Sequence, residues 1–147
     1  MNLPPCSLRL SERDGRTTVW DILRNRWIVL TPEEWVRQHF VHYLTEHKGY
    51  PASMLGNEIS LTLGATTKRC DTVLYDTSAQ ARMIIEYKAP HIDITQKVFN
   101  QICRYNIVLR VKYLIVSNGM QHFCCHVDYE SGKCTFLKEI PDYDALQ

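Results

Sequence analysis

The sequence predicts an α/β domain built on a mixed β-sheet flanked by helices. Two apolar runs, Thr72–Tyr75 and Met83–Tyr87, flank a polar stretch of small residues and predict a β-hairpin. The alternating segment Glu58–Leu63 predicts a third strand just before this hairpin, and Tyr113–Ser117 predicts a compact buried strand after it. Helical patterns precede and follow the three strands, so the core is expected to have the order αβββαβ, with further strands added. The last helix–strand step permits a parallel crossover.

Composition limits the class of protein. The 147 residues are 45% hydrophobic, which suits one globular domain with a real core. The formal net charge is +1, so any contact with nucleic acid would need a local basic patch. No apolar run approaches the ~20 residues of a membrane span, and the first ten residues do not resemble a signal peptide. We therefore expect a cytoplasmic protein without a membrane partner.

Six cysteines raise the question of disulfides or zinc. Cys70 and Cys103 fall within predicted elements, and Cys124 and Cys125 are adjacent, which does not suit a disulfide framework. We expect free thiols in a reducing cytosol. No Cys-x₂-Cys pair is present, and strand alternation sends Cys124 and Cys125 to opposite faces. The sequence therefore predicts no structural zinc, even with Cys134 and two histidines nearby.

Residues 1–30 are expected to form an N-terminal strand and hairpin extension to a main domain over residues 31–147, within one globular unit. Within the extension, the apolar runs Val19–Leu23 and Trp27–Leu30 are separated by Arg24-Asn25-Arg26, which suggests a hairpin. We interpret this hairpin as a structural cover for one sheet edge. A contact of the two arginines with DNA is the alternative.

The first predicted helix has a clear beginning. Thr31 is expected to be the N-cap, Pro32 the first helical residue and Glu34 the partner in a capping box, with the helix ending near Glu46. Its core stripe is expected to be Val36, Phe40 and Leu44. Glu33 falls on the same face, so its carboxylate is expected to point inward. The alternative is that Glu33 only complements the helix dipole.

A second helix is expected from the capping signal Asp93-Ile94-Thr95 to about Leu109. Gln101 borders its apolar stripe and lies one turn from Tyr105. The expected buried stripe is Val98, Ile102, Tyr105 and Leu109. Two final strands are expected at Phe123–Val127 and Thr135–Leu137.

The central hairpin carries the most informative polar residues. Alternation places Glu86 and Lys88 on one face, ~6.6 Å apart along the strand. Asp71 begins the partner strand and can face them, where opposed Cβ atoms lie ~5 Å apart. Two carboxylates can hold Mg²⁺ or Mn²⁺, and a lysine beside them can orient water or neutralise developing charge. The alternative is a solvated, charged surface hairpin.

These residues resemble a known family. Asp71, Glu86 and Lys88 match the Asp…Glu-x-Lys signature of the PD-(D/E)xK nuclease superfamily, and the chain is similar to the N-terminal nuclease domain of type I restriction enzyme R (HsdR-like) subunits. The likeness runs from about Thr31 to Tyr143 and departs at Cys70, where the superfamily's name implies proline. The segments that carry it are Thr31–Gln38, Ile85–Pro90, Gln101–Asn106 and Ser117–Gly119.

The resemblance implies a restriction-endonuclease-like fold and a Mg²⁺- or Mn²⁺-dependent DNA endonuclease. It implies the following roles: Asp71 and Glu86 as metal ligands, Glu33 as an accessory metal residue, Lys88 as the residue that assists the water, and Gln101 with Tyr105 as the Gln-x-x-x-Tyr pair of RecB-like nucleases. DNA is the expected partner, together with restriction-modification subunits or a separate motor chain, because no P-loop pattern occurs. The alternative is a non-catalytic nuclease-like module that binds DNA or a partner protein.

Overall fold

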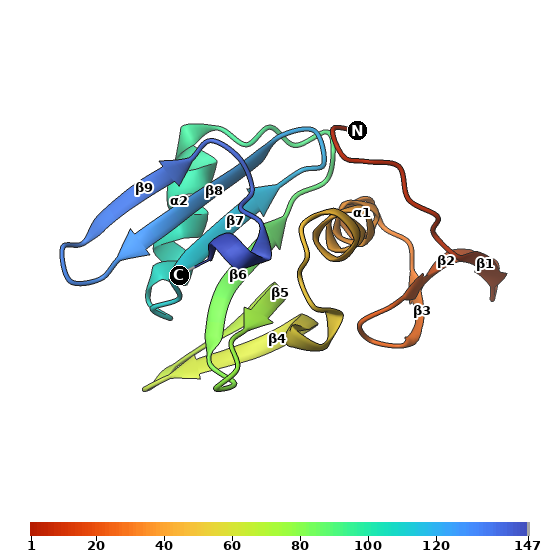
Figure 1. The fold of residues 1–147 in the computed structure, drawn as a ribbon. Coiled ribbons are helices and arrows are strands. Elements are labelled where there is room, and N and C mark those ends of the chain that lie inside the picture. The colour runs from red at the N-terminus through yellow and green to blue at the C-terminus, as the bar shows by residue number, and fades with distance from the viewer. Residues whose placement is uncertain (147) are drawn as a thin grey trace.

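The computed structural model describes residues 1–146, which form two β-sheets and two α-helices (Figure 1). The smaller sheet is antiparallel and has the order β1-β2-β3, with β1 at Leu10–Arg13, β2 at Arg16–Asp21 and β3 at Arg26–Val29. The predicted N-terminal hairpin is therefore confirmed as β2 and β3. In the described residues its sheet does not pair with an edge of the larger sheet, and it reaches edge strand β4 instead through a side-chain hydrogen bond from Asn57 to Asp21.

The larger sheet has the order β4-β5-β6-β7-β8-β9. All neighbouring strands are antiparallel except β6 and β7, which are parallel and are joined through helix α2. The predicted order αβββαβ is therefore confirmed as α1, β4 to β6, α2 and β7. The strand bounds are Leu55–Leu63 for β4, Thr66–Tyr75 for β5, Ala81–Tyr87 for β6, Tyr113–Ser117 for β7, His122–Asp128 for β8 and Lys133–Leu137 for β9.

Helix α1, Pro32–His47, covers one face of the larger sheet (Figure 1). It begins as predicted, because the Thr31 side chain accepts a hydrogen bond from the Glu34 backbone amide at 3.1 Å. Its predicted stripe is fully buried and packs on the sheet residues that alternation sends to this side. This α1-face core includes Val36, Phe40, Leu44, Leu74, Met83, Ile85, Tyr87 and Ile115.

Helix α2, Gln96–Ile107, packs on the opposite face. Here the predicted stripe is wrong in part. Phe99 and Asn106 are the buried residues of the helix, whereas the Tyr105 side chain is 53% exposed. Phe99 takes the central position against the sheet, with its ring centroid 4.9 Å from that of Phe136, and this turns the face containing Tyr105 outward. Within the described residues no helix has the length and apolar character needed to cross a membrane.

Candidate active site

Asp71 and Glu86 occupy adjoining strands at the centre of the larger sheet. The antiparallel β5–β6 ladder pairs Thr72 with Ile85. The next position in this register places Asp71 on β5 opposite Glu86 on β6. The backbone amide of Tyr87 donates a hydrogen bond to Asp71 Oδ2 at 2.9 Å, which holds the Asp71 carboxylate against β6. The expected meeting of the two carboxyl groups at the end of the hairpin is therefore present.

The surroundings of Glu86 disfavour its charged form. Burial and the adjacent Asp71 carboxylate together raise the pKa of Glu86 to about 9, and Lys88 acts in the opposite direction. At neutral pH, and without a cation beside it, the Glu86 carboxyl therefore keeps its proton. Two crowded carboxyl groups of this kind suit a hard divalent cation, whose charge would replace the proton.

A cleft of about 480 Å³ opens over this pair. It brings together all five residues that the sequence placed in the catalytic group, from β5, from the end of β6 and from α2. The lining residues are Arg69, Asp71, Glu86, Tyr87, Lys88, Gln101, Ile102, Tyr105 and Asn106. The lining thus combines two carboxyl groups with an ammonium group, a guanidinium group, amides and aromatic rings.

The α2 side of the cleft is built from exposed residues above a buried amide. Gln101 and Tyr105 are both exposed, and the Lys68 ammonium lies 3.2 Å from the centroid of the Tyr105 ring. Below them, Asn106 donates from Nδ2 to the Ile102 carbonyl at 2.9 Å. Its buried Oδ1 has no hydrogen-bond partner within residues 1–146 and is therefore available to a bound water or ligand.

Glu33 does not take the position expected from the sequence. Its side chain is exposed, and the cleft residues found within the described chain do not include it. The buried carboxylate is Glu34, which lies 2.8 Å from Arg24 and 2.8 Å from Arg37. These two guanidinium groups and the capping contact draw Glu34 inward, so the expected inward orientation of Glu33 is wrong.

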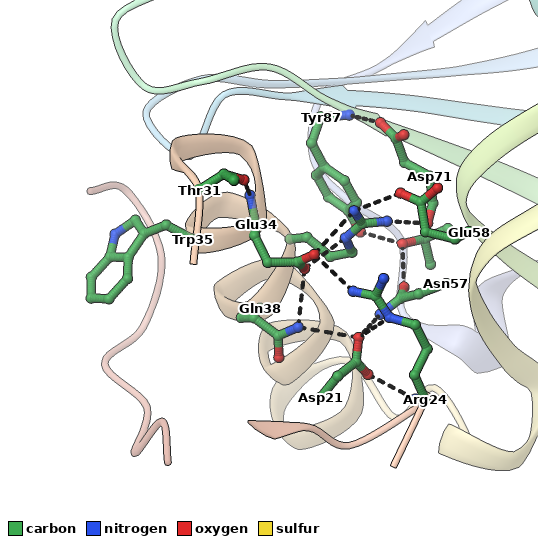
Figure 2. Close-up of polar contacts among 12 residues, drawn as sticks. Asp21, Arg24, Thr31, Glu34, Trp35, Gln38, Asn57, Glu58, Asp71 and Tyr87 are labelled. Atoms are coloured by element: carbon green, nitrogen blue, oxygen red, sulfur yellow. Dashed lines mark hydrogen bonds and ion pairs between the residues drawn. The ribbon is translucent and has the colours of Figure 1, made fainter. Parts of the chain in front are cut away.

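Arg37 is a supporting residue whose contacts the sequence did not reveal. From α1 its Nη1 donates to the Asp71 backbone carbonyl at 2.7 Å, and its Nη2 donates to Glu58 Oε1 at 2.7 Å. Figure 2 shows this group of polar side chains between α1 and the strands. Arg37 and Glu34 are three residues apart on one helix, and this spacing is the only local signal of the pair.

The polar network continues behind Asp71 to the N-terminal sheet (Figure 2). Asp21, at the end of β2, is fully buried and accepts hydrogen bonds from Gln38 and Asn57. Asn57 in turn accepts a bond from Thr72, and Thr72 accepts one from the Tyr87 hydroxyl. The extension, α1 and the central hairpin are therefore joined by one continuous set of hydrogen bonds.

Comparison with known proteins agrees with this architecture. Among solved structures, the chain is similar to a fragment assigned to an HsdR subunit of a type I restriction enzyme from Vibrio vulnificus YJ016. The TM-score is 0.54 with 21% sequence identity over 80% of this chain, and the match spans 24% of the other chain. At that identity the likeness supports the fold alone. Comparison with curated proteins gives no significant match to the chain.

The family assignment rests on sequence. Residues 32–141 match the family described as type I restriction enzyme R protein N terminus. This range includes both α-helices, the six strands of the larger sheet and every residue that lines the cleft. The resemblance to type I restriction enzyme R subunits seen in the sequence is thereby confirmed, and the chain belongs to the family of type I restriction enzyme R protein N-terminal domains.

Proposed function

We propose that this chain is a metal-dependent DNA endonuclease domain that hydrolyses phosphodiester bonds. The observation that supports this most strongly is the pairing of Asp71 with the half-buried Glu86, whose carboxyl pKa is raised, in an open cleft that Lys88 also lines. A carboxyl group in a cleft whose pKa is strongly raised by burial and by a specific charged neighbour is typical of a functional site. The other cleft residues suit a polyanionic substrate.

The two carboxyl groups would hold the cation. Asp71 and Glu86 offer the hard oxygen ligands that Mg²⁺ or Mn²⁺ takes, with the remaining positions left to water and phosphate oxygen. Such an ion, when bound, supplies Lewis-acid stabilisation of a phosphate oxygen and makes a bound water more acidic. The Tyr87 amide and the Arg37 guanidinium would keep Asp71 in place throughout.

The other cleft residues would act on the water and the DNA strand. Lys88, just beyond the end of β6, is fixed through its backbone amide, which donates to the Ser117 carbonyl at 2.9 Å. Its ammonium group would orient the attacking water or neutralise charge on the phosphate. Gln101 would donate to a carboxylate or a DNA oxygen without adding charge. Arg69 and Lys68 would contact the phosphate backbone.

The partners of the domain follow from the same proposal. DNA is the expected substrate. The 147 residues contain no Gly-x₄-Gly-Lys-Ser/Thr sequence, so movement along DNA would depend on a restriction-modification subunit or a motor segment outside this sequence.

A plasmid-cleavage assay tests this proposal. Wild type should nick or linearise supercoiled plasmid with Mg²⁺ or Mn²⁺ and not with EDTA, and Lys88→Ala should lose most of this activity. Lys133→Ala is the matched control, because Lys133 is exposed on β9 and lies outside the cleft. DNA binding without cleavage by wild type under all of these conditions would favour a non-catalytic DNA-binding module instead.

A further inference from the structure

Three cysteine thiols converge on the α2 side of the larger sheet. Cys103 comes from α2, Cys125 from β8 and Cys134 from β9, and their Sγ atoms all lie within 4.8 Å of one another. Cys125 is buried, Cys103 is half-buried and Cys134 is exposed. None of the three lines the cleft over Asp71 and Glu86, so this cluster is separate from the candidate active site.

The fold explains why these thiols meet. In the β8–β9 ladder Val127 pairs with Cys134 and Cys125 pairs with Phe136, so Cys125 and Cys134 are diagonal neighbours on one face. Phe99 anchors α2 over this face against Phe136, and Cys103 follows Phe99 by one helical turn.

The cluster bears on the prediction from the sequence that no structural zinc is present. Cys124 and Cys125 do point to opposite faces, since Cys124 belongs to the α1-face core and Cys125 to the core beneath α2. The prediction of no zinc site considered only ligands near each other in the sequence. It did not include Cys103, which α2 brings to the same face as Cys125 and Cys134.

We propose that Cys103, Cys125 and Cys134 form a binding site for a thiophilic divalent cation, with Zn²⁺ as the expected occupant. Zn–S bonds of ~2.3 Å place neighbouring sulfur atoms of a tetrahedral site ~3.8 Å apart, so the thiols need to approach by at most roughly 1 Å. Soft thiolate ligands select Zn²⁺ and similar ions, whereas the carboxylates of the cleft suit Mg²⁺. Exposed Cys134 provides an entry path and leaves the fourth position to water or another ligand.

Binding a cation there requires the thiols to lose their protons. Burial raises the pKa of both Cys103 and Cys125, and the neighbouring Cys134 adds to the effect on Cys125. Without a cation the buried thiols stay neutral and supply only weak hydrogen bonds. A bound cation would stabilise all three as thiolates, with release of their protons to solvent.

The bound ion would fix α2 to the sheet. Cys103 lies between Gln101 and Tyr105 in the sequence of α2, and these two residues line the cleft from another side of the helix. Coordination would therefore join the helix that carries them to β8 and β9. The metal-binding proposal itself does not depend on nuclease activity.

Cadmium titration of the reduced full chain tests the site, since Cd²⁺–thiolate bonds give an ultraviolet charge-transfer band that carboxylates do not. Wild type should bind one equivalent of Cd²⁺, and added Zn²⁺ should displace it. Cys134→Ser and Cys103→Ser should each weaken binding at least tenfold. Cys6→Ser is the matched control and should bind as wild type does, because Cys6 lies outside the cluster.

Thermal melts of each variant separate lost ligation from lost folding. Cys134 is exposed, so Cys134→Ser should melt as the metal-free wild type does, and added Zn²⁺ should raise the melting temperature of wild type alone. The absence of a charge-transfer band in reduced wild type would overturn the proposal. Equal charge-transfer bands in wild type and Cys134→Ser would also overturn it. So would the finding that these cysteines form a disulfide in the chain as purified and that the chain binds no metal after reduction.

Discussion

The Arg37 guanidinium donates a hydrogen bond to the backbone carbonyl of Asp71 at 2.7 Å, so a helix side chain holds the strand at the point where its key carboxylate projects. The same guanidinium lies 2.8 Å from Glu34 and 2.7 Å from Glu58. These contacts raise the pKa of Arg37 above its ordinary value despite its burial, so the group is charged at every working pH. The position of Asp71 therefore depends on α1 as much as on β5.

The first prediction concerns this support. Arg37→Met removes the hydrogen bonds and leaves the buried Glu34 carboxylate with fewer partners, so the free energy of unfolding should fall by about 3–5 kcal/mol. Urea unfolding measures the loss. Arg16→Met is the control, because Arg16 is exposed on β2 and its replacement should change stability by only about 0.5 kcal/mol. Equal losses in both variants would show that the buried network does not stabilise the fold.

A second prediction uses the protonated carboxyl. The folded protein raises the pKa of Glu86 from 4.5 to about 9, so between these pH values the folded state keeps a proton that the unfolded state loses. The stability that this proton contributes is complete below pH 4.5 and is lost as the pH rises toward 9. Glu86→Gln cannot ionise and should therefore be more stable than metal-free wild type by about 1–3 kcal/mol at pH 8.

The pH dependence separates this effect from general surface effects. At pH 4 wild type and Glu86→Gln should have equal stability, because Glu86 is protonated in both the folded and the unfolded state. Glu130→Gln, at an exposed position, should behave like wild type throughout. A stability gain for Glu86→Gln that is the same at pH 4 and pH 8 would contradict the raised pKa.

These results show which parts of the molecule could be predicted from sequence. The Thr31 cap, the strand Tyr113–Ser117 and the alternation of β6 depend on neighbouring residues, and all three are present in the structure. Tyr105 was misplaced because an apolar stripe on a short helix fits two neighbouring faces, and packing of Phe99 decides between them.

The network around Asp71 could not be predicted, because its members are far apart in the sequence. Asp21 meets Asn57 across 36 positions, and Arg37 meets Asp71 across 34. Glu33 and Glu34 show the same limit at short range. Both carboxylates suit a first helical turn, and the contacts of Glu34 with Arg37 and the distant Arg24 decide that Glu34 is the one drawn inward.

A third prediction concerns the proposed metal ligands. Mn²⁺ binding should be weak and should vanish in Asp71→Asn, as measured by titration calorimetry without DNA. Because Glu86 must release its proton, the apparent affinity should rise with pH below 9, by up to about tenfold per pH unit. Asp76→Asn in the β5–β6 loop, outside the cleft, should bind as wild type does. Equal binding by Asp71→Asn and wild type would place the ion elsewhere.

The last prediction tests whether the exposed side of α2 acts on the substrate. Gln101 is exposed and lines the cleft, and no other residue in the described chain holds its amide in a hydrogen bond. Gln101→Ala should therefore change the free energy of unfolding by less than about 0.5 kcal/mol. Cleavage or DNA binding should nevertheless fall about tenfold, because a donor to the substrate or to a metal-bound carboxylate is lost.

Gln96→Ala is the matched control for this variant, since Gln96 has the same side chain at the start of α2 and lies outside the cleft. Plasmid cleavage and fluorescence anisotropy with labelled duplex DNA would be measured for both variants beside thermal melts. If both keep wild-type activity and stability, Gln101 is a solvent-exposed residue without a part in the reaction. If Gln101→Ala also melts at a lower temperature than wild type, Gln101→Glu tests the role of the amide without shortening the side chain. Gln101→Glu lacks the amide donor and adds a negative charge that repels phosphate, so its activity should fall further than that of Gln101→Ala.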